Sequence, residues 1–306
     1  MSISLAGKCV VITGAGRGQG REIALAMAAR GAKVVVNDLG GEKDGTGADR
    51  SPADQVVSEI IQAGGQAVAN YDSVADFSAA HNIIEACIKN FGRIDVLVNC
   101  AGIGGRGFKP FWELEKDDWD SVMAVNINGT FHTCRHALGY MVHQDYGRII
   151  NFASPAWLGH GPSAYTASKG AVVSLSLGIA MSMALEGHHV TCNALIPIAE
   201  TRMSPRSGGT AGWEKMYQAG LIPRQIYEES IDPPPPSHIP AAVMYLASDD
   251  GVHLNGQIIG ASRGRVALYS QPSEFKGVYK DGPWTLEELA QRLPTAFGSG
   301  YLANRF

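Results

Sequence analysis

The sequence predicts a doubly wound α/β fold around a parallel sheet of seven strands, and three observations support it. Short apolar runs rich in β-branched residues alternate with helical patterns from Lys8 to Ile259. The run DVLVN at 95–99 has an unbroken apolar centre, as expected for a strand in the middle of a sheet. Four glycines between positions 14 and 20 follow the first run and precede a helical pattern, which indicates a tight turn between strand and helix.

The alternation places each expected element along the chain. We expect strands at residues 8–13, 33–36, 66–70, 95–99, 147–152, 190–196 and 256–259. We expect helices at residues 21–30, 53–63, 77–91, 116–129, 130–144, 163–186 and 239–247. Strand–helix–strand units of this length join parallel strands by right-handed crossovers, so one sheet covered by helices on both faces follows. Residues 1–262 are expected to form this single domain.

Two segments do not follow the alternation. Residues 203–240 contain a Gly–Gly pair and a run of four prolines, so we expect a lid insertion over the substrate site with one short helix at 211–219. Residues 263–306 form a C-terminal extension with a possible strand at 266–270 and a helix at 285–292. We expect this extension to pack on the same domain.

Composition excludes several classes of protein. The chain has 25 Lys and Arg against 29 Asp and Glu, so it lacks the basic excess of a nucleic-acid binder. No apolar run reaches the roughly 18 residues of a membrane span, and the N-terminal residues MSISLAGK lack the charged start of a signal peptide. The five cysteines are scattered without metal-ligand spacing. We therefore expect reduced thiols, no metal, no membrane partner and a cytoplasmic location.

The glycine cluster and an acid after the second strand indicate a dinucleotide site. The glycines of TGAGRGQG at 13–20 let a pyrophosphate approach the backbone at the N-terminus of the following helix. Asp38 ends the second strand, where a carboxylate accepts the ribose hydroxyls of adenosine and repels a 2′-phosphate. We therefore expect NAD rather than NADP. Arg17 is the opposing signal, because a basic residue in this turn can pair with such a phosphate.

Tyr165, Lys169 and Ser154 form the expected reactive group. Tyr165 and Lys169 are four positions apart on a predicted helix and so share a face. Ser154 follows the fifth strand, at the edge of the sheet where ligands bind. An ordinary phenol, with a pKa near 10, is a poor base at neutral pH. A cation about 4 Å away contributes about 4 kcal/mol at an effective dielectric near 20. We therefore expect Lys169 and the nicotinamide charge to lower the pKa of Tyr165.

These motifs resemble the short-chain dehydrogenase/reductase family over about residues 5–262. The resemblance is carried by TGAGRGQG at 13–20, NCAG at 99–102, VNINGTF at 125–131, Ser154 and YTASK at 165–169. It implies a Rossmann-type fold and hydride transfer between a nicotinamide and a secondary alcohol or ketone. It also implies a tetrad. Tyr165 would be the acid or base, Ser154 would bind the substrate oxygen, Lys169 would hold the nicotinamide ribose, and Asn126 would position a water linking Lys169 to solvent.

The resemblance also implies which residues bind the cofactor. They are Gly14, Gly16, Arg17, Gly18, Gln19, Gly20, Asp38, Asp72, Ser73, Asn99, Ala101, Gly102, Tyr165, Lys169, Pro197, Ile198 and Thr201. Asp72 would lie near the adenine, and Ile198 and Thr201 would contact the nicotinamide carboxamide. Trp157 and Met203 are expected to line the substrate pocket.

Three segments resemble one branch of the family more narrowly. Residues 35–57, 67–74 and 197–203 are similar to the (3R)-hydroxyacyl-CoA dehydrogenase region of the peroxisomal multifunctional enzyme and to its bacterial single-domain relatives. This resemblance implies a hydroxyacyl-CoA, a steroid or a similarly bulky apolar substrate. A small or cyclic alcohol is the alternative. The chain departs from that branch at Asn126, where the multifunctional enzyme often has histidine.

The loop between Ser154 and Tyr165 departs from the wider family. The two residues are 11 positions apart, two fewer than the commonest spacing, and Pro155 and Trp157 stand where small residues are usual. A catalytically silent NAD-binding subunit of a hetero-oligomer is therefore a further alternative. The resemblance itself implies a homo-oligomer, a tetramer or dimer paired through the helices around 116–144 and around Tyr165.

Overall fold

The computed structural model describes residues 3–105, 109–203, 210–274 and 276–297. The chain divides into two compact units. The first comprises residues 1–206 and 233–269 and contains the sheet, and the second comprises residues 207–232 and 270–306. Whether residues 203–240 act as a lid, and whether the C-terminal extension packs on the first unit, stay predictions.

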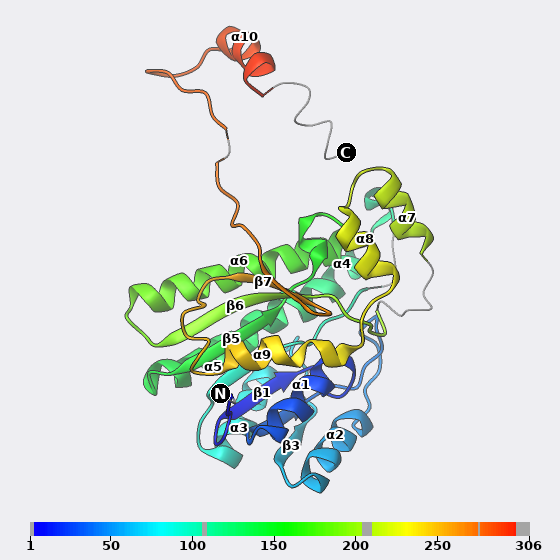
Figure 1. The fold of residues 1–306 in the computed structure, drawn as a ribbon, viewed down its shortest axis with the longest axis vertical. Helices are drawn as coiled ribbons and strands as arrows, with labels where there is room; N and C mark the ends of the chain where they lie inside the picture. The colour runs from blue at the N-terminus through cyan, green and yellow to red at the C-terminus, as the bar shows by residue number, and fades with distance from the viewer. Residues whose placement is uncertain (1–2, 106–108, 204–209, 275, 298–306) are drawn as a thin grey trace. The chain divides into compact units, whose positions relative to one another are not determined.

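The first unit is built on one sheet of eight strands (Figure 1). The strands are β1 (Cys9–Thr13), β2 (Lys33–Asn37), β3 (Gln66–Asn70), β4 (Val96–Asn99), β5 (Gly147–Phe152), β6 (Val190–Pro197), β7 (Ile258–Ser262) and β8 (Arg265–Leu268). Their order is β3-β2-β1-β4-β5-β6-β7-β8, and the first seven in chain order pair in parallel. The predicted doubly wound fold is confirmed. The strand order reverses between β1 and β4, which is where such sheets bind ligands.

The predicted count of seven strands is wrong by one. β8 pairs antiparallel with β7 and extends the sheet at its edge. A tight turn joins the two strands, with Arg263 at φ 45°. β8 is only four residues long and alternates between half-buried and exposed positions, with Val266 and Leu268 exposed. The possible strand predicted at 266–270 corresponds to β8, but it was assigned to the C-terminal extension, because so short an edge strand carries too few buried side chains to show which sheet it joins.

Seven helices predicted from the sequence appear in the first unit with slightly shifted ends. They are α1 (Gly18–Ala29), α2 (Ser51–Gln62), α3 (Phe77–Phe91), α4 (Lys116–Met123), α5 (Gly129–His143), α6 (Ser163–Leu185) and α9 (Pro240–Ala247). The expected break near residue 129 is not a break. A π-helical turn, Ala124–Asn128, joins α4 to α5, and both flanking residues keep helical dihedral angles. Gly129 does not break the helix, because it keeps helical dihedral angles and the winding continues through one wide turn.

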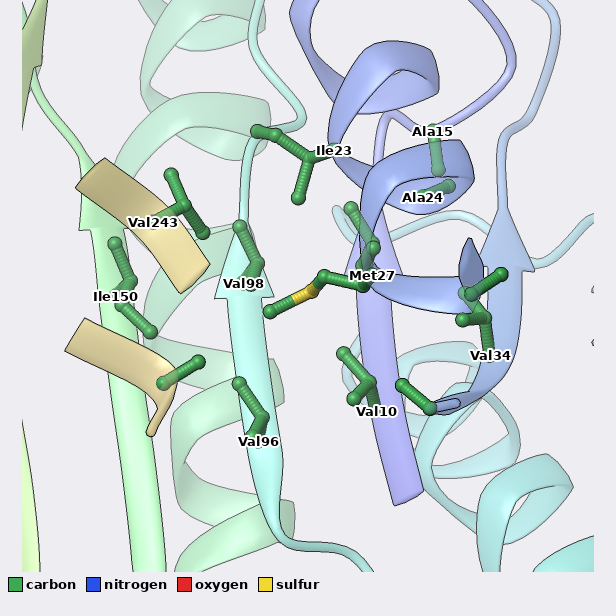
Figure 2. Close-up of a cluster of buried hydrophobic side chains, with 14 of the residues drawn as sticks. Val10, Ala15, Ile23, Ala24, Met27, Val34, Val96, Val98, Ile150 and Val243 are labelled. Atoms are coloured by element: carbon green, nitrogen blue, oxygen red, sulfur yellow. The ribbon is translucent and has the colours of Figure 1, made fainter. Parts of the chain in front are cut away.

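Alternate strand residues fill two cores on opposite faces of the sheet. On one face α1, α2 and α9 cover the strands, as Figure 2 shows for part of the cluster. Met27 of α1 lies between Val10 and Val98, and Val243 of α9 lies near Ile150. On the other face α3, α5 and α6 pack against the intervening strand residues. Burial on both faces explains why the central strands are apolar throughout.

Helix α6 is long and apolar enough, by length and composition alone, to cross a membrane. Its 23 residues include a window of mean hydropathy 1.4, of which 39% is buried inside the protein. The same helix carries the buried side chains of Ser168, Lys169 and Ser176 and packs on the sheet. A helix in a protein core passes the same test, so this is weak evidence for a membrane span.

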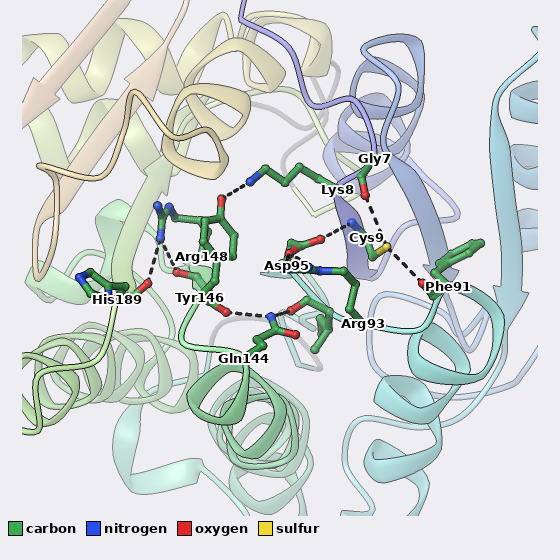
Figure 3. Close-up of polar contacts among 12 residues, drawn as sticks. Gly7, Lys8, Cys9, Phe91, Arg93, Asp95, Gln144, Tyr146, Arg148 and His189 are labelled. Carbon is green, nitrogen blue, oxygen red and sulfur yellow. Dashed lines mark hydrogen bonds and ion pairs between the residues drawn. The ribbon is translucent and has the colours of Figure 1, made fainter.

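Polar contacts at the amino-terminal ends of the strands tie neighbouring strands together (Figure 3). Lys8 Nζ donates to the Tyr146 hydroxyl at 2.7 Å, just before β1 and β5 respectively. The buried guanidinium of Arg148 donates to the carbonyls of Gly147 and His189 at 2.9 and 3.2 Å. These contacts lie at the edge opposite the switch point, so they stabilise the sheet without occupying the ligand edge.

Asp95 is the most buried carboxylate of this network, and its removal is expected to destabilise the protein. One oxygen accepts from the Cys9 N–H at 2.8 Å and the other from Arg93 at 2.6 Å, with Asp95 only 2% exposed. Asp95→Ala leaves both donors without that acceptor, so we expect a loss of about 2–4 kcal/mol in the free energy of unfolding. Urea denaturation measures it. Asp120→Ala, which removes an exposed partner of Lys116, is the control, expected to cost less than about 1 kcal/mol. Equal effects of the two variants would contradict the prediction.

The second unit contains α7 (Ala211–Gln218), α8 (Arg224–Ile231) and α10 (Leu286–Phe297). α7 and α8 are held together by stacked rings of Tyr217 and Tyr227, whose centroids are 4.7 Å apart. The expected short helix at 211–219 is therefore present, whereas α8 was not predicted. Thr285 and Glu288 cap α10 reciprocally, because each side chain accepts a hydrogen bond from the other residue's backbone N–H.

Candidate active site

The turn after β1 depends on glycines at three positions. A Cβ on Gly14, where φ is 65°, would lie 2.8 Å from Ala101 Cα. A Cβ on Gly20 would lie 2.2 Å from the Gly14 carbonyl oxygen, and one on Gly16 would lie 2.7 Å from the Pro52 side chain. No side chain fits at these contacts, so the turn packs tightly against the segment after β4. This close packing leaves the backbone itself to face a ligand.

Asp38 follows β2 and is bonded to the same turn. Its carboxylate accepts the Gly16 N–H and the Gly40 N–H, each at 2.7 Å. A Cβ on Gly16 would come within 2.8 Å of this carboxylate. The structure thus brings the predicted ribose-binding acid next to the glycine turn. A carboxylate fixed at this position fits two ribose hydroxyls and opposes a phosphate on the same sugar.

The N-terminus of α1 fits an anion. Arg17 is the N-cap residue in an extended conformation, and its side chain does not cap the helix. The first turn, which includes Gly18 and the buried Gln19, has no acidic side chain. The partial positive charge of the helix end therefore faces the turn. These residues fit the pyrophosphate of a dinucleotide.

Ser154, Tyr165 and Lys169 meet at the carboxyl end of β5. Tyr165 and Lys169 lie one turn apart on α6, and the Lys169 ammonium is 5.6 Å from the centroid of the Tyr165 ring. Lys169 is 4% exposed and donates to the Phe152 carbonyl at 2.7 Å. Ser154 and the Tyr165 hydroxyl are hydrogen-bonded to each other. A proton donor and a second hydroxyl are thus presented side by side to one substrate oxygen.

The unusual loop after Ser154 is accommodated without displacing the serine. Ser154 is the N-cap of the short 3₁₀ helix η3 (Pro155–Leu158), and its Oγ accepts the Ala156 N–H at 3.2 Å. Pro155 occupies the first helical position, where its missing N–H has no intrahelical partner to lose. The short spacing to Tyr165 is therefore filled by one tight turn, and the contact between the two hydroxyls is kept.

Burial governs the protonation of this group. Burial raises the pKa of Tyr165, and the hydrogen bond with Ser154 opposes this effect only in part. In the protein by itself the pKa of Tyr165 is thus raised, and its lowering by Lys169 together with a bound nicotinamide stays a prediction. The Lys169 ammonium lies near the Tyr165 ring and donates a hydrogen bond to the Phe152 carbonyl. A protonated phenol at neutral pH suits a proton donor to a developing alkoxide.

Burial also lowers the pKa of Lys169 from its usual 10.5 to about 8, which makes cofactor affinity pH-dependent. The ammonium form is the better donor to ribose hydroxyls, so binding favours the protonated state. We expect NADH affinity to be constant below this pKa and to weaken as the pH rises through about 8. Fluorescence titrations with NADH at several pH values from about 6 to 10 measure the affinity on both sides of this pKa. Lys169→Met should bind more weakly and show no such dependence; a parallel pH dependence in that variant would assign the titration to another group.

Asn126 lies in the π-helical turn and is fully buried. Its amide accepts the Ile103 N–H at 2.9 Å and donates to the Ile103 carbonyl and to Ser168 Oγ at 3.1 and 3.0 Å. A Cβ on Gly102 would lie 3.3 Å from the Asn126 amide oxygen and 3.4 Å from Lys169 Nζ. Asn126 therefore fixes the segment after β4 beside Lys169. Its part in positioning a water stays a prediction.

The remaining cofactor residues predicted from the sequence occupy the same edge at different depths. The Asn99 side chain is buried, donates to Asn151 at 2.9 Å and accepts from Thr133 at 2.7 Å, so it supports the edge from within the core. The Ala101 N–H donates to the Thr13 hydroxyl at 3.1 Å. Asp72 and Ser73 are half-buried directly after β3, at the β2 side of the edge.

The segment after β6 lies at the other side of the edge. β6 ends at Pro197, and the Ile198 N–H donates to the Ala261 carbonyl at 3.0 Å, while Thr201 is half-buried. The predicted pocket residues differ in exposure. Met203 is 44% exposed, with its sulfur 3.5 Å from where a Cβ on Gly104 would lie. The Trp157 ring packs edge-on against Tyr269, 6.2 Å between centroids.

Cys100 lies at the site although it was not predicted as a site residue. It is half-buried, accepts the Gly20 N–H, and lies within electrostatic range of Asp38, Tyr165 and Lys169. Burial raises the pKa of its thiol to about 12, so it is an unreactive thiol that packs between the glycine turn and Lys169. Its place in NCAG, one residue past a buried strand, was the available signal.

Comparisons with known proteins agree with this geometry. A family described as short chain dehydrogenase matches residues 8–208. The peroxisomal multifunctional enzyme type 2 of Drosophila melanogaster is 45% identical over 202 residues, which cover 65% of this chain and 32% of that protein. The hydroxyacyl-CoA dehydrogenase ChsB1 of Mycobacterium tuberculosis is 30% identical over 304 residues, covering 96% of this chain and 89% of that protein.

A solved structure supports the same relationship. The 7α-hydroxysteroid dehydrogenase complexed with NADH and 7-oxo glycochenodeoxycholic acid superposes with a TM-score of 0.71 at 30% identity, covering 85% of this chain and 95% of that one. The residues matched by the family, 8–208, include the glycine turn, the segment 99–102 and the Tyr165–Lys169 pair. The protein is therefore an oxidoreductase that belongs to the short-chain dehydrogenase/reductase family.

Proposed function

We propose that the protein transfers a hydride between NAD and a secondary alcohol or its ketone. The observation that carries this proposal is the convergence of two groups at one sheet edge. Asp38 and the glycine turn lie at the carboxyl ends of β2 and β1, and Ser154, Tyr165 and Lys169 lie at the end of β5 and the start of α6. A dinucleotide laid along that edge would reach from the first group to the second.

Each side chain of the site has a separate role in ketone reduction. When bound, the nicotinamide supplies the hydride to the carbonyl carbon. Ser154 and Tyr165 donate hydrogen bonds to the carbonyl oxygen, and the phenol proton passes to that oxygen as it becomes an alkoxide. Lys169 holds the nicotinamide ribose and stays anchored by the Phe152 carbonyl. In alcohol oxidation each of these transfers runs in reverse.

A hydroxyacyl-CoA, a steroid or a similarly bulky apolar compound is the substrate class we propose. The names of two similar proteins support it, a hydroxyacyl-CoA dehydrogenase and a hydroxysteroid dehydrogenase. Intact contact between Ser154 and Tyr165 favours an active enzyme over a silent subunit. The test is NADH oxidation over 3-ketoacyl-CoAs, keto-steroids and small cyclic ketones. Turnover of 3-ketoacyl-CoAs or keto-steroids supports the proposal, and turnover of small cyclic ketones alone would overturn the substrate class.

Asp38 is the basis of the proposed preference for NAD. Asp38→Asn removes the charge that opposes a 2′-phosphate and keeps one acceptor oxygen, enough for either the Gly16 or the Gly40 N–H but not for both. We expect the ratio of NADPH to NADH affinity to rise at least about tenfold, equivalent to about 1.4 kcal/mol. Titrations with both cofactors measure the ratio. Equal affinities in the unmodified protein would contradict the assignment.

We also propose a cytoplasmic homo-oligomer, a dimer or tetramer. Apolar side chains on the outer faces of α5 and α6 support the assembly, with Phe131, Met181 and Leu185 each more than one-third exposed. The described cysteines are free thiols, which fits a reducing compartment. Light scattering gives the mass in solution, and a monomer would overturn the assembly.

A further inference from the structure

The segment between β2 and α2 forms a closed loop, residues 39–50, which we call the strap. Its two ends are joined, because the Asp49 N–H donates to the Leu39 carbonyl at 3.0 Å. Its tip is a tight turn in which the Glu42 N–H donates to the Thr46 carbonyl at 2.7 Å. Gly40, at φ 77°, permits this closure, since a Cβ there would lie 1.8 Å from the Asp49 carbonyl oxygen. The strap is thus a compact loop of the Ω type with its own internal bonds.

The strap touches the segments that follow three other strands. After β1, Arg17 donates to the Gly41 carbonyl at 3.4 Å. After β4, the Gly104 N–H donates to the Lys43 carbonyl at 3.2 Å. After β6, Arg202 donates to the same Gly41 carbonyl at 3.2 Å. Since the strand order is β2-β1-β4-β5-β6, the strap lies over the β2-β1-β4 part of the carboxyl edge, and the Arg202 side chain reaches it from the β6 side.

We propose that the strap closes over the dinucleotide and that Arg202 is its latch. This inference rests on the proposed function, because it needs a dinucleotide between Asp38 and Tyr165. A ligand bound along that edge would lie beneath the strap and leave only when the strap opens. Arg202 is then a positioning residue for the cofactor that acts through the strap and does not touch the reacting atoms.

Two weak contacts make Arg202 a latch that opens readily. Besides the Gly41 carbonyl, its guanidinium pairs with Glu42 at 3.6 Å. The two side chains are 48% and 67% exposed, so solvent screens the pair. Arg17 holds the strap at its ribose end through Gly41 and an ion pair with Asp49 at 3.8 Å. Loss of Arg202 therefore removes the hold on the strap from the β6 side, while Arg17 and the Gly104 N–H keep their bonds to Gly41 and Lys43.

The experiment measures release of NADH by stopped-flow displacement from the full-length protein. We expect Arg202→Ala to raise the dissociation rate constant about tenfold, the effect of losing a hydrogen bond from a charged donor and an exposed ion pair. Glu42→Gln, which removes the ion pair alone, should raise it about twofold to threefold. Arg135→Ala, an exposed arginine on α5, is the matched control and should leave the rate unchanged.

The hydride-transfer rate in a single turnover separates a latch from a general structural defect. It should be the same in Arg202→Ala as in the unmodified protein, since Arg202 contacts the strap and not the reacting atoms. If NADH dissociates from both Arg202→Ala and Glu42→Gln at a rate within twofold of the unmodified protein's, the latch is overturned while the proposed function stays intact. Failure of the unmodified protein to bind NADH would overturn the proposed function and the latch with it.

Discussion

Replacing Tyr165 by phenylalanine is expected to lower kcat at least about a hundredfold, the usual scale for removing a general acid or base. The variant keeps the ring that packs beside Lys169 and loses only the hydroxyl bonded to Ser154. Because burial raises the pKa of this phenol, the hydroxyl is the proton carrier at neutral pH. Steady-state NADH oxidation with the best ketone measures the loss.

Two controls make the Tyr165 result specific. NADH affinity should change little in Tyr165→Phe, because the glycine turn and Asp38 are untouched. Tyr140→Phe on α5 removes another tyrosine hydroxyl, one bonded to Glu85 away from the sheet edge, and should keep full turnover. Near-normal kcat in Tyr165→Phe would remove the phenol from the mechanism.

Replacing Gly20 by alanine is expected to abolish detectable NADH binding at micromolar concentrations and to destabilise the protein by about 1–3 kcal/mol. The added Cβ would lie 2.2 Å from the Gly14 carbonyl oxygen and 3.0 Å from Ala15 Cα. Both of these atoms belong to the backbone. The added methyl group can therefore be accommodated only if the turn itself opens, and not by the movement of a side chain. The opened turn no longer presents its N–H groups to a pyrophosphate.

Gly139→Ala is the matched control for Gly20→Ala. Gly139 lies within α5, and a Cβ there meets nothing within 4 Å. It should leave NADH binding intact and raise stability by up to about 1 kcal/mol, since alanine is the better helix former. Fluorescence titration and thermal unfolding of both variants give the comparison. Unimpaired NADH binding by Gly20→Ala would show that the turn tolerates opening.

The spacing of residues along the chain was sufficient to predict those site residues whose placement depends on a single local element. The glycine turn, Asp38 at the end of β2, and the Tyr165–Lys169 pair each depend on positions close together along the chain. Their expected elements match the structure within a few residues. The alternation of strand and helix predicted the doubly wound sheet for the same reason, because each crossover is a local unit.

Features set by distant contacts escaped prediction. α8 lies between prolines and packs on α7 through one pair of tyrosine rings, so it has little apolar pattern of its own. The placement of Cys100 and the raised pKa of Tyr165 depend on burial among several elements. The contacts of the strap with Gly104 and Arg202 join residues about 60 and 160 positions apart along the chain, so no local pattern indicates them.

The π-helical turn at Ala124–Asn128 makes this region sensitive to changes in length. α4, the turn and α5 form one uninterrupted rod, and the wide turn accommodates an additional residue within it. Deleting one residue there would restore regular winding and leave α4 and α5 on nearly the same faces of the rod, because the wide turn absorbs that residue locally. The cost of such a deletion would fall on the turn itself, where Asn126 bonds Ile103. A deletion within α4 or α5 would instead rotate everything before it by about 100° around the rod and turn the buried side of α4 toward water. Natural length variation in this lineage is therefore expected to spare α4 and α5.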